Sequence, residues 1–182
     1  MRVIAGKAGG IRLESIDTKE VRPTLDKVKE ALFSMILPYY PFKKGLDLFA
    51  GFGTLGLEAI SRGVEELTFV EQKSQYAEVI KRNIEKCGFE DQCQVKTRNV
   101  FKYLENLNKK HDIVFLDPPY KRDYVNNTLY SLIHNDLLYN DSLLIIEHHR
   151  DENIDEIENF ITLKDRNYND TVIKVYLYKE EK

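Results

Sequence analysis

Cysteine is scarce in this sequence: only two of the 182 residues are cysteines, Cys87 and Cys93. Their spacing matches no metal-ligand motif and no disulfide framework, which favours two reduced thiols in an intracellular protein. Long apolar runs are also missing, since none approaches the about 20 residues that a membrane helix needs. Residues Met1–Leu13 lack the apolar core of a signal peptide. The sequence therefore predicts a cytoplasmic protein without a membrane partner.

The sequence also has no excess of positive charge, with 27 Lys and Arg against 30 Asp and Glu and a net charge of −3. This balance excludes a protein coated in nucleic acid, so such a partner would require basic residues gathered on one face. Internal repeats are absent, and 182 residues with 42% hydrophobic content fit one domain over residues 1–182. Residues 1–23 are expected to form a short N-terminal extension, in which Gly6, Gly9 and Gly10 suggest the turns of a hairpin.

Apolar periodicity predicts alternating strands and helices along the rest of the chain. Strands are expected over Leu46–Phe49, Leu67–Glu71, Gln94–Thr97, Asp112–Leu116, Leu143–Glu147 and Val172–Tyr178. Helices are expected between Thr24 and Pro38 and over Leu55–Arg62, Ser74–Cys87 and Tyr124–His134. The acidic stretch 151–158 is expected to be a solvated helix face. This alternation predicts a doubly wound, mostly parallel α/β sheet with an antiparallel C-terminal strand, which binds ligands at the carboxyl ends of its strands.

A glycine-rich loop, Asp47–Gly56, follows the first predicted strand. Gly51 and Gly53 have no Cβ, so a ligand could lie against their backbone, and the next helix N-terminus could receive an anionic group. Glu71 ends the second strand, 18 residues beyond Gly53, where an acid accepts hydrogen bonds from ribose hydroxyls in nucleotide-binding folds. The loop alone could be a plain tight turn. Loop and acid together favour a cofactor that contains a nucleoside, but they do not separate NAD from S-adenosylmethionine.

Polar groups also follow the third and fourth predicted strands. Asn99 could pair with an adenine edge or simply form a turn. The string Asp117-Pro118-Pro119-Tyr120 is more informative. The Asp117 carboxylate and the Pro118 carbonyl supply two acceptors, the prolines stiffen the loop, and Tyr120 offers a flat face. This arrangement fits a flat ring that carries an exocyclic NH₂, although a rigid turn capped by Asp117 is the alternative for the string taken alone.

These motifs resemble the class I methyltransferases that act on amino nitrogens of bases. The segments Arg2–Lys7, Arg22-Pro23-Thr24, Asp26–Phe33 and Leu57–Gly63 are similar to the bacterial small-subunit ribosomal RNA guanine-N2 methyltransferases. The likeness covers the chain well as far as about Tyr120 and the C-terminal third more loosely. It implies transfer of a methyl group from S-adenosylmethionine to the N2 amine of one guanine in 16S ribosomal RNA.

The resemblance also implies roles for individual residues. The cofactor would be bound by Arg22, Pro23, Thr24, Asp47, Phe49, Gly51, Gly53, Thr54, Glu71, Gln72, Asn99 and Val100. The catalytic group would be Asp117, Pro118 and Tyr120, with Asp117 as hydrogen-bond acceptor and a role as general base left open. Two positions depart from the commonest pattern: Phe52 stands where a small residue is usual, and Asn99 stands where many members carry Asp.

The few basic residues near the predicted strand ends and the N-terminus are expected to form one patch around the pocket mouth. RNA contacts are expected at Arg2, Lys7, Arg12, Pro119, Lys121, Arg122 and Arg150. Because so few charges grip loose RNA weakly, the expected partner is 16S RNA within the small ribosomal subunit or its assembly intermediate. His148 and His149 have no third ligand at a suitable spacing, so no metal site is expected.

Three alternatives stay open on the sequence. A DNA amino-methyltransferase would use the same tetrapeptide for adenine N6 or cytosine N4, but such enzymes usually carry an extra target-reading domain. A nicotinamide-dependent oxidoreductase would use the glycine loop but gives the Asp117–Tyr120 string no role. A non-catalytic RNA-binding assembly factor could retain the fold, although the intact loop and Asp117 argue against it.

Overall fold

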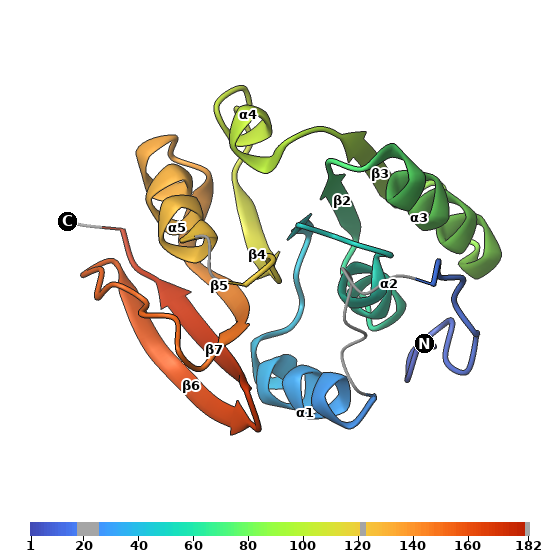
Figure 1. The fold of residues 1–182 in the computed structure, drawn as a ribbon, viewed down its shortest axis with the longest axis horizontal. Helices are drawn as coiled ribbons and strands as arrows, with labels where there is room; N and C mark the ends of the chain where they lie inside the picture. The colour runs from blue at the N-terminus through green and yellow to red at the C-terminus, as the bar shows by residue number, and fades with distance from the viewer. Residues whose placement is uncertain (18–25, 121–122, 181–182) are drawn as a thin grey trace.

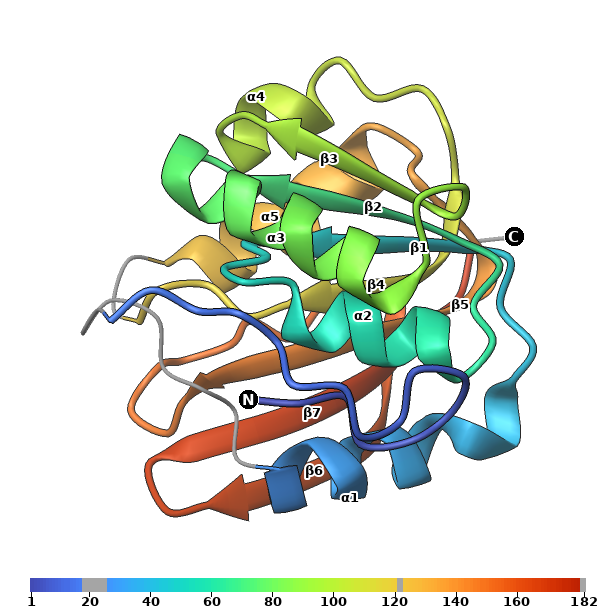
Figure 2. The same ribbon diagram turned by 90° about the vertical axis from the view of Figure 1, so that its right-hand side faces the viewer.

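The computed structural model describes residues 1–17, 26–120 and 123–180. Its centre is a seven-stranded sheet with the order β3-β2-β1-β4-β5-β7-β6 (Figure 1, Figure 2). The strands are β1 Lys44–Leu48, β2 Glu66–Glu71, β3 Cys93–Thr97, β4 His111–Leu116, β5 Leu138–His149, β6 Phe160–Tyr168 and β7 Thr171–Tyr178. Strands β1 to β5 pair in parallel, whereas β7 pairs antiparallel with both β5 and β6. The predicted doubly wound sheet with an antiparallel C-terminal strand is confirmed.

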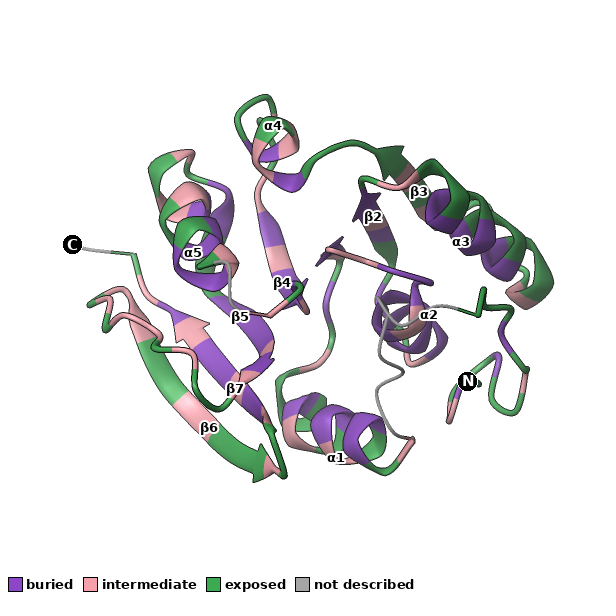
Figure 3. Ribbon diagram, viewed as in Figure 1, coloured by how far each residue is buried: buried purple, intermediate pink, exposed green. Residues whose placement is uncertain are grey.

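Helices cover both faces of this sheet (Figure 1). They are α1 Asp26–Ile36, the short 3₁₀ helix η1 Leu37–Tyr39, α2 Thr54–Ser61, α3 Ser74–Cys87, α4 Val100–Leu104 and α5 Tyr124–His134. Along β4 the side chains alternate: Ile113 and Phe115 join the apolar cluster under α1, α2 and α3, and Val114 and Leu116 join the cluster under α4 and α5. Burial on both faces, visible as purple central strands in Figure 3, explains the continuous apolar run of this strand.

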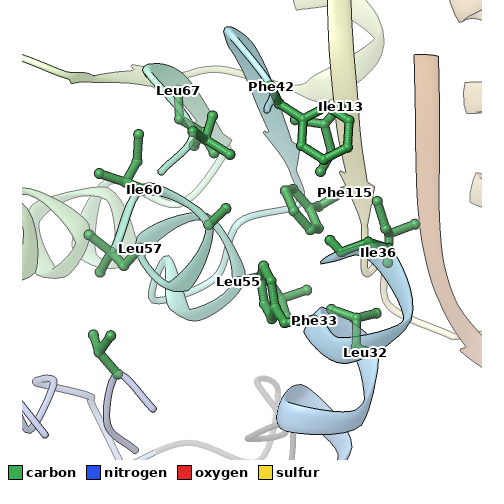
Figure 4. Packing of buried hydrophobic residues seen from close by; sticks show 14 of the residues in the cluster. Leu32, Phe33, Ile36, Phe42, Leu55, Leu57, Ile60, Leu67, Ile113 and Phe115 are labelled. Carbon is green, nitrogen blue, oxygen red and sulfur yellow. The ribbon is translucent and has the colours of Figure 1, made fainter. Parts of the chain in front are cut away.

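The packing under α1 and α2 fixes these helices on the sheet (Figure 4). Phe33 of α1 lies 5.9 Å from Phe115 of β4, measured between ring centroids, and both rings are almost fully buried. Leu55 and Ile36 are part of the same cluster. Burial of each such side chain contributes roughly 1.5–3 kcal/mol to stability. The cluster therefore holds α2 so that its first residue faces the carboxyl ends of the strands.

The N-terminal segment folds back on itself and docks on α2. Arg2 and Arg12 form an antiparallel bridge, which confirms the predicted hairpin-like turn between them. Ala8 N donates to the Ser61 hydroxyl at 2.9 Å. Gly6 has a φ of 82°, and a Cβ at this position would lie 1.9 Å from the carbonyl oxygen of Ser61, so the close approach requires glycine here.

The acidic stretch 151–158 is not a helix, and that prediction is wrong. Its backbone bonds to a side chain of α5 instead, since Asp155 N donates to Asn126 Oδ1 and Asn126 Nδ2 donates to the carbonyl of Asn153. Ile154 and Ile157 pack against the core beneath α5. These contacts hold the stretch in an irregular conformation that charge patterning alone does not indicate.

Three elements of the described structure were not predicted: the short 3₁₀ helix η1, helix α4 and strand β6. Helix α4 has only five residues, too few to show helical periodicity. Strand β6 is a mostly exposed edge strand rich in polar residues, and it forms through its ladder with β7. Its polar sequence gives no apolar signal because the strand buries little surface.

The two cysteines are free, as predicted. Burial raises the pKa of the Cys93 thiol to about 12, so this thiol stays protonated at neutral pH. Across residues 1–17, 26–120 and 123–180, no helix has the length and apolar character needed to cross a membrane.

Candidate functional site

A pocket of about 500 Å³ opens at the carboxyl edge of the sheet. From β1 the chain proceeds to β2 and β3 on one side, and later to β4 and β5 on the other, so the strand order reverses between β1 and β4. A crevice at such a switch point is the usual ligand site of a doubly wound sheet. The pocket is lined by Met1, Phe49, Ala50, Gly51, Phe52, Thr54, Glu71, Gln72, Lys73, Tyr76, Asn99, Val100, Phe101, Asp117, Pro118, Pro119, Tyr120, Tyr124 and Glu147.

Glu71, at the end of β2, ties the glycine loop to the neighbouring strand. Its Oε2 accepts a hydrogen bond from Gly51 N at 3.0 Å, and its Oε1 accepts one from Lys73 N at 2.8 Å. Burial raises the pKa of this carboxyl group, and the backbone N–H donors partly oppose the rise. The carboxylate therefore sits on the pocket wall with its orientation fixed by backbone donors, as a ribose-binding acid requires.

Asp47 and Gly53, both expected at the cofactor, lie behind the pocket wall rather than in it. Asp47 Oδ2 accepts a hydrogen bond from Gly56 N at 3.0 Å, which joins the end of β1 to the first turn of α2. Burial raises the pKa of Asp47 to about 7. The hydrogen bond from Gly56 N opposes this rise, and the negative charge of Glu71 adds to it. Gly53 has a φ of 78° and packs against Phe69 and Ile80. Both residues shape the loop without facing the pocket.

The Asp117–Tyr120 string forms the opposite wall. Asp117 is half-buried and Pro118 is buried, while Pro119 is exposed. Burial raises the pKa of Asp117 well above its ordinary value, and the nearby charges of Glu147 and Asp47 raise it further. The hydroxyl of Tyr120 lies 3.1 Å from Thr171 Oγ1 of β7, which anchors the ring at the edge of the pocket.

Glu147 is a pocket residue that the sequence did not single out. It follows Ile146, which pairs with Leu116 of β4, so it stands beside Asp117 on the adjacent strand. The sequence offered one signal for it, the position of an acid at the end of an apolar strand. The same position drew attention to Glu71 and could have drawn attention to Glu147.

Three aromatic rings, which we call the aromatic trio, line one end of the pocket: Phe49, Phe101 and Tyr124. The rings of Phe49 and Tyr124 stack with centroids 5.5 Å apart, and Phe101 lies 6.4 Å from Phe49 and 5.7 Å from Tyr124. Phe49 was an expected cofactor contact, but Phe101 and Tyr124 were not predicted. They come from the first turns of α4 and α5, and only the fold brings them together.

Asn99 caps α4, because its Oδ1 accepts hydrogen bonds from Phe101 N at 3.0 Å and Lys102 N at 3.3 Å. It lines the pocket next to the buried Val100.

Phe52 stands where related sequences usually carry a small residue, and its packing explains why a large side chain fits. The Phe52 ring packs edge-on against Tyr76 of α3, with centroids 5.1 Å apart, so the large side chain fits where a small residue is usual.

The basic residues predicted for RNA are not all at the pocket mouth. Lys121 and Arg122, expected to contact RNA, lie outside the residues that the structure describes, as do Arg22, Pro23 and Thr24, which were expected to bind the cofactor. Thr54 begins α2 at the pocket, whereas Lys7 N bonds to the carbonyl of Ser61 at the other end of this helix.

The backbone of Lys7 is therefore separated from the pocket by the length of α2, about 12 Å, and its contact with RNA stays a prediction. Figure 2 shows the turn that carries Lys7 beside the far end of α2. Arg12 is exposed, and its backbone pairs with that of Arg2 in the antiparallel bridge. The side chain of Arg2 forms an ion pair, with its Nε 3.0 Å from Asp26 Oδ2. Arg150 is also exposed and lies 3.4 Å from Asp170.

Within the described part of the chain, no group of three or more His, Cys, Asp or Glu side chains is arranged to hold a metal ion. His148 Nδ1 contacts the carbonyl of His149, and burial lowers the pKa of His148. The pocket thus offers carboxylates, a proline carbonyl and aromatic faces as its chemical groups. Such groups bind a planar ring with N–H donors and a positively charged ligand.

The strand order, with the antiparallel β7 inserted between β5 and β6 of an otherwise mostly parallel doubly wound sheet, is that of the class I methyltransferases. The RNA methyltransferase from Salinibacter ruber, solved in complex with S-adenosyl-L-homocysteine, shares the fold. Its TM-score is 0.66 at 13% identity, with 88% of this chain and 96% of that chain covered. The Escherichia coli chain yhhF aligns with a TM-score of 0.90 at 27% identity, covering 100% of this chain and 99% of that one.

Sequence comparison narrows the class to a family. The family described as Conserved hypothetical protein 95 matches residues 1–177. The ribosomal RNA small subunit methyltransferase D of Haemophilus influenzae is 35% identical over 170 residues, which span 91% of this chain and 88% of that protein. The chain belongs to this family, the ribosomal RNA small subunit methyltransferase D family.

Proposed function

We propose that this protein transfers a methyl group from S-adenosylmethionine to the exocyclic N2 amine of one guanine in 16S ribosomal RNA. The observation that carries the proposal is a shared pocket: the Asp117-Pro118 acceptor pair faces the same space as Glu71 and the glycine loop. One side suits an amine on a flat base, and the other suits a nucleoside cofactor. Relatives named ribosomal RNA small subunit methyltransferase D support RNA of the small subunit as the substrate.

The residues present fit S-adenosylmethionine. Glu71 has a fixed carboxylate for the ribose hydroxyls, and the aromatic trio offers apolar faces for adenine. Asp117 and Glu147 give the pocket the negative character that favours a sulfonium ion. When bound, the cofactor would supply an electrophilic methyl group on a positively charged sulfur. The S-adenosyl-L-homocysteine complex of the Salinibacter ruber protein supports the same choice.

The chain's own residues would activate the amine by position and charge. The lone pair of the guanine amine is delocalised into the ring, so the amine is a weak nucleophile. The Asp117 carboxylate and the Pro118 carbonyl would accept hydrogen bonds from the two N–H groups of the amine. These bonds would help to localise the lone pair on nitrogen. Fixed acceptors of this kind contribute mainly through preorganisation. After transfer, the methylated nitrogen must lose a proton, and Asp117, with its raised pKa, is suited to accept it.

We infer that the substrate is a structured, protein-containing particle. Among the basic residues expected to contact RNA, Arg2 and Arg150 form ion pairs with acidic neighbours, and Lys7 lies at the far end of α2. Few charges at the pocket mouth give a weak, salt-dependent grip on loose RNA. Selection of one guanine would then depend on the shape of a folded target from which the base is splayed.

Mass spectrometry of ribosomal RNA nucleosides, from cells with and without the gene, tests the reaction. N2-methylguanosine should fall by one residue per 16S RNA in the deletion strain and return with the wild-type gene. Calorimetric titration with S-adenosylmethionine and NAD tests the cofactor, since only the former should bind. An unchanged nucleoside profile, or preferential binding of NAD, would contradict the proposal.

A second experiment tests the state of the substrate. Protein-free 16S RNA and purified small subunits, both from the deletion strain, are methylated at one salt concentration. The subunits should react faster. A clear preference for naked RNA would contradict the structured-particle proposal and leave the methyl-transfer reaction itself intact.

A further inference from the structure

Two carboxylates from neighbouring strands stand side by side in the pocket. Leu116 of β4 pairs with Ile146 of β5, and Asp117 and Glu147 follow these residues directly. Adjacent strands lie about 4.8 Å apart, so the two acids continue two neighbouring backbones at that spacing. Both side chains line the same pocket, and the charge of Glu147 contributes to the raised pKa of Asp117. The pocket therefore presents two adjacent acceptors on the strand ends opposite the glycine loop.

The Watson–Crick edge of guanine has a matching pair of donors. Its N2 amine is flanked on one side by N1, which carries a hydrogen, and on the other by N3, which carries a lone pair. A carboxylate beside the acceptor of the amine can bind N1–H, whereas it would repel N3. Adenine and 2-aminopurine present a lone pair at N1 and would be repelled as well. A second carboxylate at this place thus distinguishes guanine from other purines that carry an amine.

We propose that Glu147 is the residue that selects guanine, by accepting the N1–H bond while Asp117 accepts a hydrogen bond from the N2 amine. The inference rests on the proposed function, because it assumes guanine N2 as the methyl acceptor. It adds a base-reading role to a residue outside the Asp117–Tyr120 string. Glu147 also belongs to the ladder between β5 and β7, where it pairs with Ile173, so its backbone is held in place by the sheet.

The test compares guanine with 2-aminopurine at the methylated position, in small subunits reconstituted with otherwise identical 16S RNA. 2-Aminopurine keeps the reacting amine but carries a lone pair at N1. Single-turnover rates with saturating enzyme give the preference of each variant. The wild-type protein should prefer guanine by at least about 10-fold, as expected for loss of a hydrogen bond to a charged group. In Glu147→Gln the amide can donate to N1 of 2-aminopurine, so the preference should shrink by about 10-fold or more.

The exposed Glu156, which follows β5 outside the pocket, provides a matched control. Glu156→Gln should keep the wild-type preference. If Glu147→Gln also keeps it while guanine is still methylated, Glu147 does not read the base and only this inference fails. If the wild-type protein does not methylate the guanine at all, the proposed function fails with it.

A measurement on the wild-type protein alone guards against a variant that does not fold. A target carrying N1-methylguanine keeps the N2 amine and lacks N1–H. Its methylation should be at least about 10-fold slower than that of guanine. Equal rates on the two bases would overturn the proposal without any substitution in the protein.

Discussion

Two regions of this molecule hold buried carboxyl groups in opposite surroundings. Outside the pocket lining, Glu58 of α2 is fully buried and surrounded by donors and cations. Its oxygens accept hydrogen bonds from Ile4 N at 2.6 Å, Ala5 N at 3.1 Å and Arg62 Nε at 2.6 Å. Lys29 Nζ lies 3.7 Å away, and this lysine is itself 1% exposed. Through these contacts Glu58 links the N-terminal segment and α1 to α2.

Glu71, Asp117 and Glu147 on the pocket wall, and Asp47 behind it, gather at the ends of neighbouring strands. Their mutual charges add to the effect of burial: Glu71 raises the pKa of Asp47, and Glu147 and Asp47 raise the pKa of Asp117. This region holds its negative groups close to one another, whereas the Glu58 region places a carboxylate among positive charges. Groups at functional sites often have perturbed pKa values for this reason.

The difference separates a carboxylate paired with cations from a group of carboxylates that lie near one another at the ligand edge of the sheet. A buried carboxylate whose oxygens are all hydrogen-bonded has little capacity to bind a further ligand. Removing one member of its ion pair leaves the other charge buried without compensation. A cluster of like charges lowers stability in the free protein and gains a favourable partner when a cation or N–H donor enters. Substitutions in the two regions should therefore change different properties, and four experiments test this, from the largest expected effect to the smallest.

Glu58→Gln should reduce the free energy of unfolding by about 3–5 kcal/mol, because it removes the carboxylate that lies 3.7 Å from the buried Lys29 ammonium. Urea denaturation followed by circular dichroism measures the loss. The double variant Lys29→Met with Glu58→Gln should recover only part of the loss, since the buried ammonium is removed while Arg62 still lacks its carboxylate partner. A loss of unfolding free energy below about 1 kcal/mol in the single variant would show that the contacts of Glu58 do not stabilise the fold.

Asp117→Ala should slow methyl transfer to small subunits by roughly 10²–10³-fold or more, a loss typical for a fixed electrostatic group in an active site. Cofactor affinity should stay within a few-fold, and stability should not fall, because a charge leaves a like-charged cluster. The matched control is Asp112→Ala near the start of the same strand, where the carboxylate binds Lys43 N at 2.7 Å and Lys44 N at 2.9 Å. This control should lose stability and retain the rate. The reverse pattern would contradict the comparison.

Glu71→Ala should weaken S-adenosylmethionine binding by roughly 1.5–3 kcal/mol, the value of hydrogen bonds to a charged group. The structure adds that stability should also fall, because Gly51 N and Lys73 N lose their acceptor. Calorimetric titration and thermal unfolding of the same sample separate the two effects. Unchanged affinity in a folded variant would remove Glu71 from the cofactor site.

Asp47 should make the free energy of unfolding fall as the pH rises. An acid held in a salt bridge has the opposite effect, because its pKa is lowered in the folded protein. Its pKa is about 7 in the folded protein and 3.8 as the ordinary value, so the folded state holds this proton more tightly. The stability from Asp47 is therefore present below about pH 4 and lost as the pH rises toward 7, by at most about 1.4 kcal/mol per pH unit. Asp47→Asn should remove this slope. Urea unfolding between these pH values, compared between the two proteins, checks it, and parallel curves would contradict it.

Local patterns in the sequence predicted much of this architecture. The apolar runs at Leu67–Glu71 and Asp112–Leu116 correspond to β2 and β4, and Ser74–Cys87 matches α3 residue for residue. The signal was strong there because each strand is buried on both faces and the helix on one. Glu71 and Asp117 were identified for a related reason, since an acid at the end of an apolar strand of a doubly wound sheet must reach its ligand edge.

Other parts depended on contacts between distant segments. The acidic stretch 151–158 is irregular because Asn126 of α5 bonds to its backbone, and β6 forms only against β7. The position of Lys7 follows from the docking of the N-terminal turn on Ser61. Neither hydrophobic period nor charge pattern encodes such contacts, because the partners lie tens of residues apart in the chain.

The sequence by itself determined the class of fold, the glycine loop and the acceptor string, because each depends on short-range periodicity and on residues adjacent along the chain. The tertiary structure decided which carboxylates meet. Glu58 is surrounded by Lys29, Arg62 and backbone donors, whereas Glu147 lies next to Asp117. Local patterns place Glu58 inside a predicted helix and Glu147 at the end of a predicted strand, but they do not show which charged groups each carboxylate meets. Their different roles come from long-range packing, which sets whether a buried carboxylate finds a cation or another carboxylate.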